Sequence, residues 1–333
     1  MRIFGKPKGK DKFVHVEATE KLEKNGIPAE QAFIVDLKDN DWKVRESAAK
    51  ALDQIGWKPN HGEIGVYYWI AKRNWKKCKE IGSPAVIPLI EQLKERANFA
   101  NVGTEIRQVC YVLGEIGDNR AVEDLNEVLL KLENSSYAAA WALGEIRDKR
   151  ALEPLCEAFS KAADNPYGRM HGCDICIEII NALEKFELFP PTEKRLVAGH
   201  IVEGLFHHPV LEHHSENFIS KLGPDVIDPL ISKIRRTKMT KDLSPKVIEI
   251  FENYGTGNES AQDLYVDLIM HLKGGPYGQG YTKERIIGLL GRQGTPTAIP
   301  ILEKSLNDTD DKTQIAAKNA IELISSRYGL KHS

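Results

Sequence analysis

The sequence predicts an all-α fold, a right-handed α-solenoid of about eight helix pairs, from two observations. The first is an internal repeat: YVLGEIGDNRAVEDL at 111–125 and WALGEIRDKRALEPL at 141–155 are identical at nine of fifteen positions. The second is that apolar residues recur at helical spacing, whereas no segment alternates over the length of a strand. Helical units that repeat with this period bury their apolar faces by stacking on their neighbours.

The composition is that of a globular chain. Of the 333 residues, 41% are apolar and 28% are charged, which excludes a disordered or fibrous protein. Because a solenoid grows by adding units, we expect one domain over 14–328, with a flexible basic head at 1–13 and a tail at 329–333.

The charge is unevenly distributed along the chain. Residues 1–81 carry 17 Lys and Arg against 12 Asp and Glu, whereas 82–333 carry 29 against 36, a net charge of -7. A nucleic-acid-binding protein is expected to show a strong basic stripe, so nucleic acid is an unlikely partner. No motif calls for a cofactor, and we expect none.

The cysteines and the apolar segments indicate the compartment. Five cysteines, an odd number, stand mostly within apolar helical phrases, which disfavours a disulfide framework and favours a reducing compartment. The basic start lacks the apolar core of a signal peptide, and no run of 18 apolar residues occurs. The sequence therefore predicts a cytoplasmic protein without a membrane partner.

Read from its start, the sequence predicts a helix at 14–24 and then two helices within 29–56. In DWKVRESAAKALDQIG at 41–56, one apolar stripe is formed by Val44, Ala48, Leu52 and Ile55, and a glycine ends the helix.

This phrase resembles the second helix of a HEAT-like repeat and is most similar to the short kind found in phycocyanobilin lyase subunits (the PBS lyase HEAT-like family). The entries to later units resemble it too. Each has a loop glycine, a capping polar residue, an apolar pair and often a proline, as in IGSPAVIPLI (81–90), IGDNRAVEDL (116–125), IRDKRALEPL (146–155), LGPDVIDPLI (222–231) and QGTPTAIPIL (293–302).

These entries allow eight helix pairs, which belong to an armadillo-like type of fold. We place them at about 29–56, 84–117, 119–147, 149–187, 192–222, 225–255, 258–293 and 296–328. The resemblance further implies that Asp41 and Arg45 belong to a structural ladder between adjacent repeats, and Arg107 stands at the position of Arg45 in a later unit.

Two clusters of metal-binding residue types leave alternatives open. His207, His208, His213 and His214 lie in one phrase, but Pro209 interrupts the helix, so solvated turn histidines are expected rather than a metal site. Cys173 and Cys176 form a lone C-x-x-C for which core packing is the expected role. HEAT-like deoxyhypusine hydroxylases hold two irons with His-Glu pairs, and this chain has no His-Glu dipeptide. We therefore expect no metal.

An aromatic-rich insertion at 57–82 provides the candidate binding residues. On one helix over 63–78, Trp69, Lys72, Arg73 and Lys76 would share a face and form a protein-binding or anion-binding patch. The same helix would bury Trp75 and leave Trp69 partly exposed. An alternative is that the helix only covers one end of the solenoid. Arg107 completes the candidate binding residues.

Function follows from the architecture, because no convincing catalytic set is present. We expect a non-catalytic scaffold or adaptor that binds another protein through its concave face, lined by second helices, and through the loops between helices. The alternative, implied by the family resemblance, is a bilin lyase-like enzyme subunit or chromophore-attachment factor.

Overall fold

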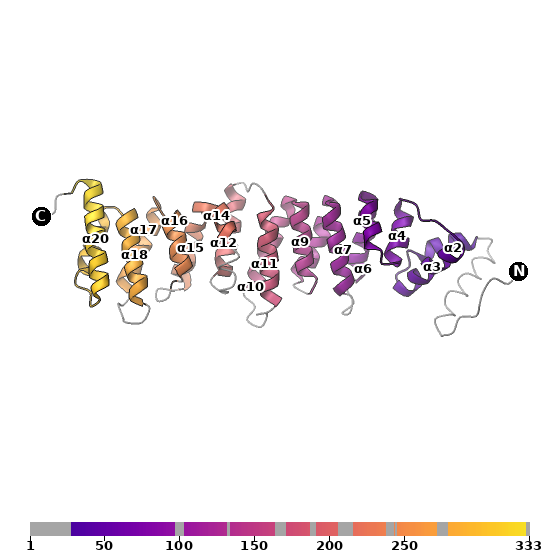
Figure 1. The fold of residues 1–333 in the computed structure, drawn as a ribbon, viewed down its shortest axis with the longest axis horizontal. Helices are drawn as coiled ribbons and strands as arrows, with labels where there is room; N and C mark the ends of the chain where they lie inside the picture. Colours follow the sequence, from indigo (N-terminus) through magenta and orange to yellow (C-terminus); the bar gives the residue numbers. More distant parts are fainter. Residues whose placement is uncertain are drawn as a thin grey trace. The chain divides into compact units, whose positions relative to one another are not determined.

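The computed structural model describes residues 28–96, 103–131, 134–163, 171–186, 191–205, 216–237, 243, 245–271 and 279–330 (Figure 1). Every regular element within these ranges is a helix, and no strand occurs among them, which confirms the all-α prediction. The basic head at 1–13 and the helix expected at 14–24 lie outside the described residues.

The eight predicted helix pairs are present at the expected positions. They are α2 (Ala29–Asp36) with α3 (Trp42–Gln54), α6 (Val86–Arg96) with α7 (Gly103–Ile116), α8 (Val122–Leu130) with α9 (Ser136–Ile146), α10 (Leu152–Ala163) with α11 (His171–Glu184), α12 (Pro191–Leu205) with α14 (Glu216–Leu222), α15 (Ile227–Thr237) with α16 (Pro245–Tyr254), α17 (Glu259–His271) with α18 (Gln279–Gln293), and α19 (Ile299–Ser305) with α20 (Asp311–Tyr328).

The insertion at 57–82 differs from its prediction. It forms two helices, α4 (Glu63–Ala71) and α5 (Trp75–Ile81), so the expected single helix over 63–78 is wrong. Arg73 adopts a left-handed conformation (φ 52°), which ends α4, and the Asn74 side chain then caps α5. Arginine rarely adopts a left-handed conformation, and no glycine stands at this break to mark it in the sequence.

The two helices of the insertion take the places of a further repeat. α4 packs against α6, which is a first helix, and α5 packs against α7, which is a second helix. The insertion is therefore a short, degenerate helix pair stacked in series with its neighbours.

Contacts divide the chain into two compact units. Unit 1 comprises Met1–Ala158 and Asn181–Phe186, and unit 2 comprises Phe159–Ile180 and Glu187–Ser333. In each unit, first helices pack on first helices and second helices on second helices, for example α7 on α9 in unit 1 and α18 on α20 in unit 2.

The internal repeat reflects the core of unit 1. Three of its shared apolar positions are completely buried in both copies, and these are Leu113 and Leu143, Ala121 and Ala151, and Leu125 and Leu155. The fourth, Ile116 and Ile146, is half-buried. The identical residues are thus those that fill equivalent positions between neighbouring pairs.

Glycines allow adjacent second helices to pack backbone against backbone. A Cβ added to Gly114 of α7 would lie 2.7 Å from the Cα of Ala142 on α9, which is closer than real atoms approach. The equivalent glycine of the next copy, Gly144, would approach the Cα of Ala182 to 2.6 Å. In unit 2, a Cβ on Gly291 of α18 would lie 2.7 Å from the Cα of Ala320 on α20.

The turns before the first helices are linked by arginines. Arg120 binds both carboxylate oxygens of Asp118, at 2.9 and 2.7 Å, and also donates to the carbonyl oxygen of Ser83 at 3.0 Å in the preceding turn. The next copy repeats this arrangement: Arg150 binds both oxygens of Asp148, at 3.0 and 2.8 Å, and donates to the carbonyl of Asn119 at 2.9 Å.

Arg45 on α3 is hydrogen-bonded to α6, the first helix of the pair that follows the insertion, and its assignment to a ladder between adjacent repeats stays a prediction. Arg45 is 2% exposed and donates to the carbonyl oxygens of Asp39 and Asn40, at 2.5 and 3.3 Å, and to Oε1 of Gln92 on α6, at 3.0 Å. Asp41 has a local role, because its side chain is the N-cap of α3.

Two alanine substitutions on α18 should shift stability in opposite directions. Gly291→Ala should destabilise unit 2 by about 1–3 kcal/mol, because its methyl group would overlap Ala320. Gly288→Ala should stabilise it by up to about 1 kcal/mol, because an added Cβ meets only Arg292 Nη1, at 3.4 Å, and alanine favours helix. Melting followed by circular dichroism tests this, and equal shifts would contradict the close packing.

Arg45→Ala should lower the free energy of unfolding by about 1–3 kcal/mol, because buried Gln92 would lose this hydrogen bond. The matched control is Arg107→Ala, which removes an arginine that is only half-buried. Urea titration of both variants gives the comparison, and an Arg45→Ala midpoint equal to that of the control would exclude the structural role.

The linked turns should also make stability depend on acid pH. The bidentate bond from Arg120 lowers the pKa of Asp118 to about 2, and Arg150 lowers the pKa of Asp148. Because these values lie below an unfolded pKa of about 3.9, the stabilisation is complete above that pH and is lost as pH falls toward 2. We expect Asp118→Asn to lower the melting temperature at pH 6 and to flatten its fall between pH 4 and pH 2. A slope equal to that of the unsubstituted chain would contradict this account.

Candidate functional site

Hollows occur on the second-helix faces of both units. In unit 1, the aromatic hollow has a volume of about 580 Å³ and is lined only by α5, α7 and α9. Its lining residues are Trp75, Lys76, Lys79, Gln108, Tyr111, Val112, Glu115 and Trp141.

Three half-buried aromatic side chains form the centre of the aromatic hollow: Trp75, Tyr111 and Trp141. The rings of Tyr111 and Trp141 meet edge to face, with their centroids 5.2 Å apart. These two residues begin the two copies of the repeated phrase, so consecutive second helices present them in the same register. The sequence prediction missed this pair, although an aromatic residue at the first position of both copies was the available signal.

Charged side chains surround the aromatic centre. Lys79 forms an ion pair with Glu115 at 2.8 Å, and Lys76 is exposed. Lys185 lies 5.4 Å from the ring centroid of Trp141 and binds Glu145 at 2.7 Å. The result is a partly apolar surface with a charged rim, an arrangement typical of protein-binding sites.

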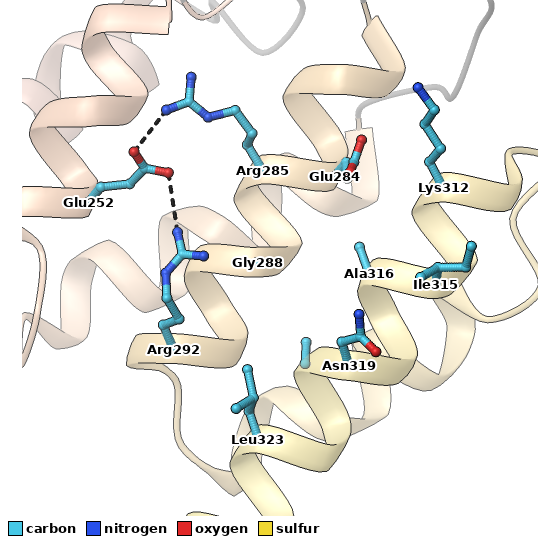
Figure 2. Close-up of a pocket in the computed structure, with 11 residues that line it drawn as sticks. Glu252, Glu284, Arg285, Gly288, Arg292, Lys312, Ile315, Ala316, Asn319 and Leu323 are labelled. Atoms are coloured by element: carbon cyan, nitrogen blue, oxygen red, sulfur yellow. Dashed lines mark hydrogen bonds and ion pairs between the residues drawn. The ribbon is translucent and has the colours of Figure 1, made fainter.

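Unit 2 contains a second hollow, the arginine hollow, of about 610 Å³, between α16, α18 and α20 (Figure 2). On one side, Glu252 accepts hydrogen bonds from Arg285 at 2.8 Å and from Arg292 at 3.2 Å. On the other side, α20 contributes Ile315 and Leu323, whose exposed fractions of 61% and 49% are large for apolar residues.

Gly288 lies between the two arginines and leaves the arginine hollow open (Figure 2). It stands three residues before Gly291, as Tyr111 stands three residues before Gly114. Since Gly291 and Gly114 make equivalent close contacts, Gly288 takes the position that an aromatic side chain fills in unit 1.

The predicted patch of Trp69, Lys72, Arg73 and Lys76 does not share one helix face, because α4 ends before Arg73. Trp69 is half-buried, as expected, but it packs against the core cluster of unit 1 and meets Tyr68 edge to face. Trp75, predicted to be buried, is only half-buried because it lines the aromatic hollow.

The cations of the predicted patch have different surroundings. Lys72 binds Asp53 at 2.5 Å, and this bond lowers the pKa of Asp53. Arg73 binds Glu105 at 2.8 Å and lies 5.2 Å from the ring centroid of Trp42. Lys76 is the patch residue that belongs to the aromatic hollow.

Arg107 lies on α7, next to a residue that lines the aromatic hollow. Its guanidinium donates to Thr104 at 3.1 Å and stands 5.9 Å from the ring centroid of Tyr137. The structure therefore places Arg107 and Lys76 near the second-helix face, whereas Asp41 and Arg45 remain in the turn and packing positions described above.

The described cysteines are inert thiols. Cys78, Cys110, Cys156 and Cys176 are free and buried. Burial raises the pKa of Cys78, Cys110 and Cys156 to about 12, so these thiols stay protonated at neutral pH and are poor nucleophiles.

The two clusters singled out as candidate metal ligands lie largely outside the described side chains. No group of three His, Cys, Asp or Glu side chains suited to a metal ion occurs in the described part of the chain. His207, His208, His213 and His214 and the side chain of Cys173 lie outside the described residues. Among the helices that are described, none has both the length and the apolar character needed to cross a membrane.

Comparisons with known proteins support the repeat assignment. A HEAT repeat matches residues 31–56, which contain α2 and α3, and a PBS lyase HEAT-like repeat matches residues 137–161, which run from α9 into α10. These matches confirm the resemblance at those two places, and the chain therefore contains HEAT-like repeats.

Comparison with whole proteins adds little. No curated protein sequence matches the chain. Among solved structures, human deoxyhypusine hydroxylase in complex with glycerol is similar over 93% of this chain and 98% of that chain, with 14% identity and a TM-score of 0.28. A similarity this low carries no argument about chemistry.

Proposed function

We propose that this HEAT-repeat chain is a non-catalytic scaffold that binds another protein through its second-helix faces, with the aromatic hollow as the main contact. The observation that carries the proposal is the set of three half-buried aromatic residues on consecutive second helices: Trp75, Tyr111 and Trp141. Tryptophan and tyrosine dominate the energetics of protein interfaces when a partner completes their burial.

The charges around the aromatic hollow suit a protein partner. The ion pairs of Lys79 with Glu115 and of Lys185 with Glu145 lie at its rim, where pairs set orientation and register more than affinity. The arginine hollow offers a second contact of similar type, with exposed Ile315 and Leu323 beside Arg285 and Arg292.

The longer loops between helices were also expected to bind the partner. Residues 97–102, 164–170 and 272–278 of these loops lie outside the described residues. Their contribution stays a prediction.

The double variant Trp75→Ala with Lys76→Glu tests the main contact, because it removes one aromatic wall and reverses one rim charge. The binding partner is first identified by capture on the immobilised chain and is then titrated calorimetrically. We expect affinity to fall more than about tenfold, since hot-spot truncations cost about 2 kcal/mol or more.

The matched control is Lys149→Glu, an exposed charge reversal in the turn before α10. It should leave affinity unchanged, and both variants should keep the helical circular dichroism signal. If the double variant binds as tightly as the control, the aromatic hollow is not the contact.

The bilin lyase-like alternative stays a prediction and has its own test. Mixing the purified chain with bilin should leave the visible spectrum of the pigment unchanged if the scaffold assignment is right. A shifted and intensified absorption band would favour chromophore handling instead.

A further inference from the structure

The three aromatic side chains of the aromatic hollow stand at equivalent positions of consecutive second helices. Trp75 is four residues before Lys79, and Tyr111 is four residues before Glu115. The ion pair of Lys79 with Glu115, at 2.8 Å, joins these two helices at the same level. Because Tyr111 and Trp141 also share one register, the aromatic positions form a row that crosses α5, α7 and α9.

The aromatic row is not closed by ring stacking. Tyr111 and Trp141 touch edge to face, with their centroids 5.2 Å apart, and so form one wall of the aromatic hollow. Trp75, at the other end of the row, makes no ring contact with any described residue. The hollow therefore has an aromatic side chain at each end and room for an apolar group against them.

Both tryptophans of the row have a hydrogen-bond donor that faces solvent. Neither Trp75 nor Trp141 donates a hydrogen bond within the described part of the chain, and neither indole N–H is among its buried atoms that lack a partner. Exposed Gln108 adds an amide to the same lining. A partner that covers these donors must replace water with acceptors of its own.

The spacing of the helices indicates which backbone conformation can follow the row. Packed helices lie about 8–10 Å apart. Side chains on one face of a β-strand repeat about every 6.7 Å, since each residue rises about 3.3 Å. Those on one side of a polyproline II helix repeat about every 9.3 Å, since three residues rise about 3.1 Å each. The polyproline II repeat is the one that matches the helix spacing.

The available donors favour the same conformation. An α-helix uses its backbone carbonyl groups internally, so it has few acceptors for the indole N–H groups. A polyproline II segment has no internal hydrogen bonds, so its carbonyl groups remain free to accept. Proline also lacks a backbone N–H that would need an acceptor, and its ring packs on aromatic side chains.

Lys76 adds a charge to the rim of the aromatic hollow. It is exposed and forms no ion pair with a described residue. The carboxylate one turn further along α5, Glu80, is bound by Lys77 at 2.6 Å, and Glu115 is bound by Lys79. The rim therefore carries one positive charge in excess, which is complementary to an acidic residue of a partner.

We propose that the aromatic hollow binds a proline-rich segment of a partner protein in the polyproline II conformation, with an acidic residue beside its prolines. This inference rests on the protein-binding function proposed above and specifies the chemistry of the partner. The row covers two helix spacings, about 16–20 Å. A segment of about six residues, at about 3.1 Å each, is long enough to contact all three aromatic side chains.

Calorimetric titration of the full chain with synthetic peptides tests the inference. The probe repeats Pro-Pro-Leu over about nine residues between two glutamates, and its control has alanine in place of every proline. We expect saturable one-to-one binding of the probe and no binding of the control. A second probe with lysines in place of the glutamates should bind more weakly, because Lys76 repels it.

Matched variants assign the binding to the aromatic hollow. Trp75→Ala should weaken binding of the probe at least about tenfold. Trp42→Ala should leave binding unchanged, because this tryptophan is 43% exposed and does not line the hollow. Lys76→Glu should make the lysine probe the tighter ligand. Since Lys76 is exposed, this variant should keep the fold even if Trp75→Ala does not.

Three results would overturn the inference. They are no saturable binding of the glutamate probe, equal losses in Trp75→Ala and Trp42→Ala, or an unchanged preference between the two charged probes in Lys76→Glu.

The captured partner separates this inference from the function on which it rests. If the partner binds through Trp75 but the probe neither binds nor competes with it, the protein-binding function stands and the polyproline II inference is wrong. If neither ligand depends on Trp75, both are wrong. Competition between the probe and the partner is the result that supports both.

Discussion

The close approach of neighbouring second helices is the constraint on which the described surfaces depend. Where Gly114 meets Ala142 and Gly291 meets Ala320, the helix backbones touch, and no side chain can stand between them. The residue three positions earlier lies on nearly the same helix face. In unit 1 this residue is Tyr111, which joins an aromatic cluster, and in unit 2 it is Gly288, which leaves a hollow between arginines (Figure 2).

Many of the charged residues serve the architecture rather than a site. Arg120 and Arg150 connect the turns of successive first helices, and Arg45 joins two helix pairs from a buried position. The bonds of Arg120 and Arg150 fix the spacing of repeats, because each of these two arginines holds its own turn and the preceding one at the same time. The aromatic hollow combines α5, from the short pair that departs from this pattern, with α7 and α9, which carry the repeated phrase.

The position of the aromatic hollow follows from the stacking of consecutive second helices. The buried leucines and alanines of the repeated phrase serve stacking, whereas its first position, Tyr111 and Trp141, lines the aromatic hollow. The aromatic hollow begins at α5, which belongs to the most degenerate pair of unit 1.

The sequence by itself determined the repeat, the all-α class and the bounds of eight helix pairs, because apolar periodicity and helix caps are local signals. It did not predict the break at Arg73, since a left-handed arginine is decided by packing and has no glycine to mark it. Nor could it assemble the aromatic hollow, because Trp75, Tyr111 and Trp141 come from different helices whose register is set only when repeats stack. Tertiary structure decides which aromatic and cationic side chains share one surface, because helix-to-helix packing is a contact between residues distant in sequence.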